Sequence, residues 1–397
     1  MKKLLFVVDT DWFFISHRLA LAVAAKEDGH TVAVVAYDTG KADMIREMGI
    51  KFIHADVVRK GLNPLKELIN ARALYKIYKA EQPDIVHHIT LKMIIIGSLA
   101  ARLAGVKSIV NAVTGLGHFF INQKKELMVN LLFSPIFKMI STTPGLKYIF
   151  QNRDDQDVFV CRGWADASSS ILISGSGVDL EEYKFIPEPD TFKILVSCGT
   201  RLLGDKGIYE FAEASRLLTD RYPGHVECVL AGRIITENPT SISLCEINEW
   251  VEEGILSYRG FQTDMYDFLG KCHINVLPSY REGLPRSLIE ACAVGRPIVT
   301  TDVPGCRDVV SNGINGFLVP ARDGKKLADA IALLIDDKEL RERMGRESRR
   351  KAEQEFDLKI VIKDTLKVYD SFNQKWDCLL PATSYVVGCS TKIEVLG

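Results

Sequence analysis

Short apolar runs alternate with amphipathic helical patterns from the N-terminus onward, and this alternation constrains the fold more than any other feature. A continuous apolar run is typical of a buried strand, whereas apolar positions spaced three and four residues apart indicate a helix. The expected strands are residues 3–8, 31–36, 50–54, 84–88 and 107–113, and the expected helices are residues 16–27, 64–80 and 92–104. Strands that alternate with helices indicate an α/β fold with a parallel, doubly wound sheet.

A second alternation of the same kind begins near residue 192. Its expected strands are residues 192–198, 226–231, 256–258, 273–277, 297–301 and 316–320, and its expected helices include residues 207–220, 265–271 and 325–336. We therefore predict two doubly wound domains, residues 1–175 and 176–357, facing each other across a central cleft. The boundary is expected within residues 174–189, where Gly, Pro and acidic residues cluster. Residues 377–397 show no clear pattern and receive no assignment.

Residues 278–291 are predicted to form a loop that leads from a strand into a helix N-terminus. Pro285 suits the first turn of that helix, and Gly283 allows another group to approach the backbone closely. A helix start of this kind favours an anion such as phosphate. Two carboxylates, Glu282 in the loop and Glu290 in the helix, could each accept hydrogen bonds from a pair of sugar hydroxyls. The alternative is an ordinary strand–turn–helix with two solvated acids.

A Gly-rich turn with two cations follows the first expected strand of the second domain. It contains Gly199, Arg201, Lys206 and Gly207, and a helix is expected to begin at its end. Arg offers a planar, bidentate donor and Lys a point charge, so the pair is suited to clamping a diphosphate. The alternative is a solvated basic loop.

Together the two segments resemble the signature of the retaining glycosyltransferases of family 4, which have the GT-B fold. The resemblance rests on the cations Arg201 and Lys206 and on two glutamates, Glu282 and Glu290, separated by seven residues. It implies that Glu282 contacts the donor sugar and that Glu290 binds the nucleotide ribose. It implies that Arg201 and Lys206 neutralise the leaving nucleotide diphosphate, a task that a metal ion performs in other glycosyltransferases. It also implies that a last helix, residues 358–372, packs back on the first domain.

Further donor contacts are expected from loops at the ends of two other strands. Residues 231–233 and 260–261 match family loops that contact the base and the ribose, and Phe261 could contact uracil. The alternative for Phe261 is simple core packing. The complete set of expected donor-binding residues is Gly199, Arg201, Lys206, Arg233, Phe261, Glu282, Gly283, Leu284, Pro285 and Glu290.

The first loop departs from the family pattern. Many family members carry glycines there that contact the donor phosphates, but this chain has none between Asp9 and Arg18, so that role is not assigned. Asp9 and Asp11 form a DxD sequence, the metal motif of the other glycosyltransferase fold. Because Arg201 and Lys206 already supply positive charge, we predict no metal site and no cofactor.

Acceptor-binding residues are expected in the first domain. His17 and Arg18, at the expected start of the first helix, could grip an acceptor phosphate. The alternative is an ordinary helix N-terminus capped by Ser16.

Residues 115–122, together with residues 61–64, resemble the branch of the family that extends undecaprenyl-diphosphate sugars. The resemblance makes His118 a candidate catalytic residue, as an acceptor-side base or hydrogen-bond donor. A structural role for His118 is the alternative.

The charge of the chain is uneven. Residues 1–175 carry 22 Lys and Arg against 16 Asp and Glu, which suits an anionic partner such as a membrane surface. Residues 126–140 combine apolar side chains with lysines and could rest on a membrane, although a buried helix pair is the alternative.

The nine cysteines show no pairing pattern, the N-terminal apolar run is too short for a signal peptide, and no run is long enough to span a membrane. We therefore expect a cytoplasmic protein at the inner face of the cell membrane.

These observations predict a retaining, metal-independent glycosyltransferase. Its expected donor is a UDP-sugar carrying a hexose or an N-acetylhexosamine, its expected acceptor is a polyprenyl-diphosphate-linked saccharide, and nucleic acid is not an expected partner. No side chain stands out as a covalent nucleophile, and the resemblance implies a front-face mechanism. Two alternatives remain: a nucleotide-sugar epimerase of the same fold, and a non-catalytic nucleotide-sugar-binding protein.

Overall fold

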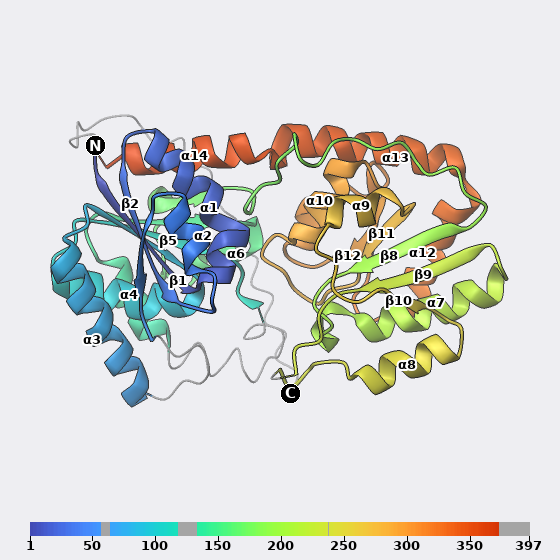
Figure 1. Cartoon of the computed structure of the whole chain (residues 1–397), viewed down its shortest axis with the longest axis horizontal. Helices are drawn as coiled ribbons and strands as arrows, with labels where there is room; N and C mark the ends of the chain where they lie inside the picture. Colours follow the sequence, from blue (N-terminus) through green and yellow to red (C-terminus); the bar gives the residue numbers. More distant parts are fainter. Residues whose placement is uncertain (57–63, 118–132, 237, 373–397) are drawn as a thin grey trace, which may run out of the picture.

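The computed structural model describes residues 1–56, 64–117, 133–236 and 238–372. These residues form two parallel α/β units that lie side by side (Figure 1). The prediction of two doubly wound sheets is therefore confirmed.

The first sheet has seven parallel strands within the described residues, in the order β3-β2-β1-β4-β5-β6-β7. They are β1 (Lys3–Thr10), β2 (Thr31–Tyr37), β3 (Lys51–His54), β4 (Ile85–Ile89), β5 (Ser108–Val113), β6 (Leu146–Phe150) and β7 (Ser170–Leu172). Helices of this unit include α1 (Asp11–Glu27), α2 (Ala42–Glu47), α3 (Pro64–Glu81), α4 (Leu91–Ala104) and α6 (Arg153–Cys161). The central strands are apolar along nearly their whole length because helices cover both faces of the sheet.

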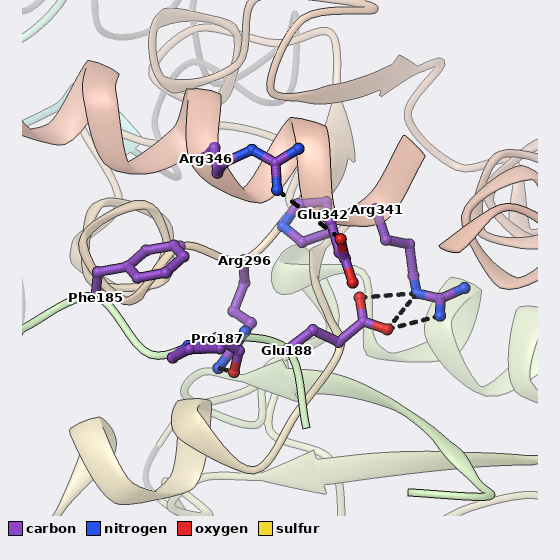
Figure 2. Close-up of a pocket in the computed structure, with 9 residues that line it drawn as sticks. Phe185, Pro187, Glu188, Arg296, Arg341, Glu342 and Arg346 are labelled. Atoms are coloured by element: carbon purple, nitrogen blue, oxygen red, sulfur yellow. Dashed lines mark hydrogen bonds and ion pairs between the residues drawn. The ribbon is translucent and has the colours of Figure 1, made fainter. Parts of the chain in front are cut away.

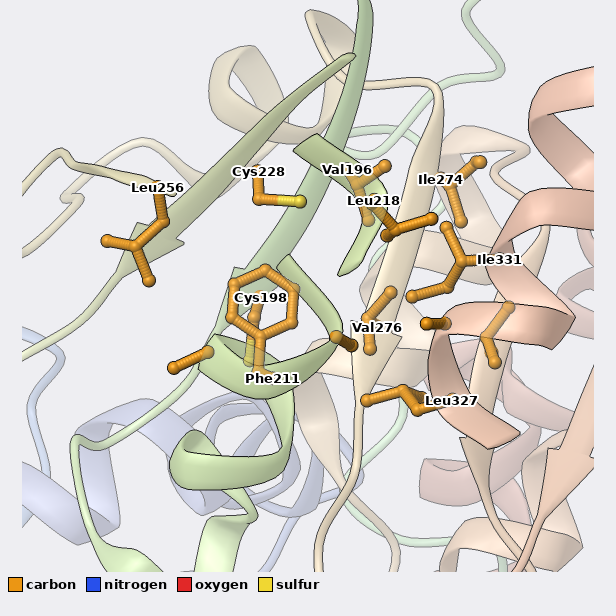
Figure 3. Packing of buried hydrophobic residues seen from close by; sticks show 14 of the residues in the cluster. Val196, Cys198, Phe211, Leu218, Cys228, Leu256, Ile274, Val276, Leu327 and Ile331 are labelled. Carbon is orange, nitrogen blue, oxygen red and sulfur yellow. The ribbon is translucent and has the colours of Figure 1, made fainter. Parts of the chain in front are cut away.

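The second sheet has six parallel strands in the described part of the chain, in the order β10-β9-β8-β11-β12-β13. They are β8 (Ile194–Gly199), β9 (Val226–Ala231), β10 (Ser257–Tyr258), β11 (Ile274–Leu277), β12 (Ile298–Thr301) and β13 (Gly316–Val319). Its helices include α7 (Ile208–Arg221), α8 (Leu244–Glu252), α9 (Met265–Gly270), α10 (Arg286–Val294), α11 (Cys306–Val309), α12 (Gly324–Asp336) and α13 (Lys338–Lys351). Figure 3 shows side chains of α7 and α12 packed against those of the strands in one apolar core.

The last helix, α14 (Leu358–Asp370), packs on the first unit beside α1 (Figure 1). Val361, Val368 and Tyr369 belong to the same apolar core as the strands β1 and β2. The Tyr369 hydroxyl is hydrogen-bonded to His87 Nδ1 in β4 at 2.6 Å, and the Tyr369 carbonyl accepts from Lys2 Nζ at 3.0 Å. The C-terminal end of the described chain therefore completes the core of its N-terminal half.

The first helix begins earlier than predicted. α1 starts at Asp11 rather than at residue 16, because Thr10 is its N-cap and accepts a hydrogen bond from the Phe13 N–H. Ser16 therefore lies inside the helix, where its hydroxyl donates to the Trp12 carbonyl. The alternative that Ser16 caps α1 is therefore wrong, and so is the expectation that His17 and Arg18 open the helix. The short elements α2, β6, α6, β7, α8 and α11 were not predicted.

Several sequence regions singled out above fall outside the described residues, namely 61–63, 118–122, 126–132 and 377–397. In the described part of the expected membrane-facing stretch, residues 133–140, Phe137 and Ile140 are buried in the first core. This packing favours the buried alternative for that part. None of the helices within the described residues is both long enough and apolar enough to cross a membrane.

The second core allows a direct test of packing. Phe211 on α7 is fully buried, whereas Leu217 on the same helix is 41% exposed. Phe211→Ala is expected to lower the free energy of unfolding by about 3–5 kcal/mol, because it leaves a cavity in the core. Leu217→Ala is the control and should cost under about 1 kcal/mol. Urea unfolding measures both variants, and equal losses would contradict the buried position of Phe211.

Candidate active site

The two predicted signature segments meet at the carboxyl ends of β8 and β11. Lys206 Nζ lies 2.5 Å from Glu282 Oε1, and the two side chains are only 8% and 15% exposed. Gly207, with φ of 72°, makes this approach possible, because a Cβ atom there would clash with the Pro278 carbonyl. A cation and a carboxylate separated by 76 residues in sequence are thus brought into one site.

The backbone around Glu282 is tightly enclosed. The Glu282 N–H donates to the Pro304 carbonyl at 3.0 Å, and Gly283 is so close to the Thr114 carbonyl that a Cβ atom would clash with it. Leu284 and Pro285 are buried as well. Pro285 has an extended backbone and is the N-cap of α10, so the helix begins one residue after it.

Glu290 lies inside α10 and is 5% exposed. Its Oε1 accepts from Arg286 Nε at 2.6 Å, and Tyr183 also hydrogen-bonds to its carboxylate. Burial raises the pKa of Glu290, while the charge of Arg286 opposes the rise. The Arg286 guanidinium also donates to the Ser16 carbonyl of α1. The carboxylate is therefore fixed by a cation that bridges the two units.

The remaining expected donor residues lie at the ends of neighbouring strands. Gly199 ends β8, and Arg201 follows it with an exposed side chain. Beyond β9, the Arg233 guanidinium lies 4.4 Å from the centre of the Phe261 ring. Phe261 is 49% exposed, so the alternative that it packs in the core is wrong. An exposed aromatic face beside a guanidinium is suited to stacking on a planar base.

His17 lies on the side of α1 that faces the second unit, near Arg286 and Arg201. Its ring stacks on Phe13 at 4.3 Å, and its Nδ1 is 2.7 Å from Ser16 Oγ. Burial, with further contributions from Arg286, Arg18 and Arg201, lowers the pKa of His17 to about 3. The imidazole is therefore neutral near pH 7 and cannot supply positive charge to an acceptor phosphate.

Arg18 follows His17 on α1, but its side chain is buried in the first unit. It is 5% exposed and donates to the carbonyl of His17, and no partner is found for its Nε among the described residues. Its positive charge acts to lower the pKa of His87 and of Tyr369, which lie in the core beneath α1. The structure therefore places Arg18 in the interior of the first unit.

Both carboxylates of the DxD sequence, Asp9 and Asp11, accept hydrogen bonds from other residues of the first unit. Asp11 is buried and accepts from the Thr39 N–H, the Thr39 hydroxyl and the Lys41 N–H. The Thr90 hydroxyl donates to Asp9 at 3.0 Å. His118, the remaining catalytic candidate, lies outside the described residues.

The contacts between the two units were missed at the sequence level. Arg281 forms an ion pair with Asp155 of α6, and Asn152, the N-cap of α6, donates to the Gly283 carbonyl at 2.6 Å. One available signal was the Asn152 position itself. An Asn that follows an apolar run and precedes two acids is typical of a helix N-terminus at the end of a strand.

Two cavities lie at the opposite edges of the sheets from these loops. One, of about 240 Å³, includes the Glu188–Arg341 ion pair of 2.7 Å (Figure 2). It is lined by Phe185, Pro187 and Glu188, by residues 295–297 and by side chains of α13. The other, of about 420 Å³, lies at the amino ends of β1, β4 and β5. Ligands of doubly wound sheets bind at the carboxyl ends of the strands, so neither cavity is the candidate donor site.

Comparison with known proteins identifies the family. The model of the glycosyl transferases group 1 matches residues 179–351, and the glycosyl transferase 4-like model matches residues 3–143. The chain is 30% identical, over 90% of its length and 97% of the relative's, to the N,N'-diacetylbacillosaminyl-diphospho-undecaprenol alpha-1,3-N-acetylgalactosaminyltransferase of Campylobacter jejuni. It is 26% identical, over 78% of its length and 81% of the relative's, to the Escherichia coli UDP-Gal:alpha-D-GlcNAc-diphosphoundecaprenol alpha-1,3-galactosyltransferase.

Solved structures share the fold. Anabaena HepE in complex with UDP and glucose aligns with a TM-score of 0.74 at 18% identity, covering 94% of this chain and all of HepE. A Rickettsia africae glycosyltransferase aligns with the same TM-score over 94% of this chain and 99% of its own. The predicted GT-B fold is therefore confirmed, and the chain belongs to the group 1 glycosyltransferases, family 4.

Proposed function

We propose that this glycosyltransferase moves a hexose or N-acetylhexosamine from a UDP-sugar to a polyprenyl-diphosphate-linked saccharide, with retention of configuration. The observation that carries the proposal is the contact between Lys206 and Glu282. It brings the cation expected at the donor diphosphate beside the carboxylate expected at the donor sugar. The relatives named for undecaprenyl-diphosphate-linked acceptors, and HepE with bound UDP, support the choice of substrates.

On the donor side, Arg201 and Lys206 bind the diphosphate, and Arg233 with Phe261 holds the base. A bound diphosphate offers Lys206 a stronger anionic partner than a single carboxylate. Glu282 is then released to accept hydrogen bonds from sugar hydroxyls. Glu290, already fixed by Arg286 and Tyr183, accepts from the ribose.

The chemistry follows a front-face course that needs no metal ion. Arg201 and Lys206 stabilise the negative charge that develops on the departing phosphate. That phosphate oxygen accepts the proton of the incoming hydroxyl, which attacks from the same face, so the configuration is retained. Glu282 orients the sugar for this step.

On the acceptor side, we keep His17 as a candidate contact. A neutral imidazole can accept or donate one hydrogen bond to a saccharide hydroxyl. The buried position of Arg18 gives its expected acceptor role no support, and the role of His118 stays a prediction.

A transfer assay tests the proposal. Purified enzyme is incubated with a panel of labelled UDP-sugars and a bacterial lipid extract, with and without excess EDTA. Label is expected in the lipid fraction with the anomeric configuration of the donor, and EDTA should leave the initial rate nearly unchanged. Interconversion of free UDP-sugars would instead indicate an epimerase, and binding without turnover a non-catalytic protein. A large loss of rate that Mn²⁺ or Mg²⁺ restores would contradict metal independence.

Substitution of the two glutamates should have different effects on UDP affinity and on turnover. Glu290→Gln removes a charged acceptor at the ribose, a loss of about 1.5–3 kcal/mol. UDP affinity should therefore fall about 10- to 100-fold. Glu282→Gln should leave UDP affinity nearly unchanged and reduce turnover of the complete donor. Titration calorimetry with UDP, beside steady-state rates, measures both effects. The reverse pattern would mean that the two assignments are exchanged.

Contact with the membrane is proposed from the charge of the first unit. Binding to vesicles should require anionic lipid and weaken as salt rises, because exposed charges are screened within about 8–10 Å at physiological ionic strength. Vesicle flotation at two salt concentrations measures this. Equal binding to neutral and anionic vesicles would rule out the electrostatic explanation.

A further inference from the structure

The loop that carries Glu282 is anchored on both sides by the first unit. Arg281, the residue before it, is paired with Asp155, and the carbonyl of Gly283, the residue after it, accepts from Asn152 Nδ2 at 2.6 Å. Asp155 and Asn152 both belong to the start of α6. One helix start therefore holds both neighbours of a residue that belongs to the opposite unit.

The anchoring groups form one buried network. Asp155 is fully buried, and its Oδ2 accepts from the Leu116 N–H at 3.3 Å and from Asn152 Nδ2 at 3.1 Å. Asn152 Oδ1 in turn accepts from the Asp155 N–H at 2.8 Å. The side chain of Arg281 is only 13% exposed. Because Oδ2 is held by two donors of the first unit, the carboxylate is oriented with Oδ1 toward Arg281.

The backbones of the two units approach closely at Gly115 and Gly283. A Cβ atom on Gly115, whose φ is 119°, would lie 2.9 Å from the Gly283 Cα and N atoms. A Cβ atom on Gly283 would lie 2.7 Å from Gln151 Oε1. Since real Cβ atoms do not come this close, a side chain at either glycine would force the units apart. The network is therefore complete only when the two units are closed.

We propose that Asp155 and Asn152 are positioning residues that set the Glu282 carboxylate in place when the two units close. This proposal rests on the function proposed above. Lys206 holds the Glu282 side chain from within the second unit, whereas α6 fixes the backbone on both sides of it. Separation of the units would leave the Lys206 contact intact and release the backbone. Glu282 would then reach its working position only in the closed form.

The first experiment compares two adjacent acids of α6. Asp155→Asn keeps the size of the side chain but removes the charge that faces Arg281. Its kcat is expected to fall about 100-fold, as for a reacting group displaced by about 1 Å, while UDP affinity stays nearly unchanged because the expected UDP contacts lie in the second unit. Asp154→Asn is the matched control. Asp154 pairs with Arg307 across the same interface at 3.3 Å, but its side chain is 36% exposed. Because exposed ion pairs contribute little, the kcat of Asp154→Asn should change no more than about fivefold.

A second variant decides the case in which Asp155→Asn does not fold. Arg281→Gln removes the other partner of the pair and should also lower kcat with UDP affinity retained. The double variant should be no slower than the slower single variant, because both changes remove the same contact. An unchanged kcat in Arg281→Gln, or equal losses in Asp155→Asn and Asp154→Asn, would overturn the proposal.

Small-angle X-ray scattering separates this proposal from the proposed function. With UDP bound, Asp155→Asn should have a larger radius of gyration than the wild type, since the units are no longer held closed. This readout requires no transfer activity. If the wild type transfers no sugar but the scattering difference is found, the proposed function fails and the closure contact stands. Identical scattering curves would overturn the closure contact whatever the enzyme does.

Discussion

The contact between Lys206 and Glu282 is the interaction on which the arrangement of the site depends. A buried ammonium or carboxylate is costly unless it is paired at short range, and here the two groups are 2.5 Å apart in a largely buried setting. Each comes from a loop at the end of a different parallel strand, β8 or β11. The turn at Gly207 and the enclosure of Gly283 are the backbone conditions that allow the charges to meet.

The fold could be predicted to a large extent, because a parallel sheet covered on both faces leaves a strong pattern of apolar runs. That pattern located the longer elements within a few residues of their observed ends. It failed for β7, which has three residues, and for α8, which is short. It also misplaced the start of α1, because Thr10 and Ser16 are both plausible caps and only the hydrogen bond to Phe13 distinguishes them.

The site was predictable only where its residues are close in sequence. Glu282 and Glu290 share one segment, and Arg201 and Lys206 share another, so their spacing could be compared with a known signature. Asp155 and Arg286 act through partners that are distant in the chain, namely Arg281 and the Ser16 carbonyl. Such contacts depend on how two sheets are placed, which a periodic pattern does not encode. The burial of Arg18 could not be predicted for the same reason, because Arg18 on α1 lies near Tyr369 of α14, which is distant in the chain.

The return of α14 to the first unit has a consequence for synthesis on the ribosome. Val361, Val368 and Tyr369 fill the core beneath α1, next to the strands β1 and β2, which are made long before α14. The first sheet therefore leaves the ribosome with part of its apolar face uncovered. That face is covered only after the whole second unit and α14 have been made. A nascent chain that stops after α13 presents that face to solvent, where it is a binding surface for chaperones and a starting point for aggregation.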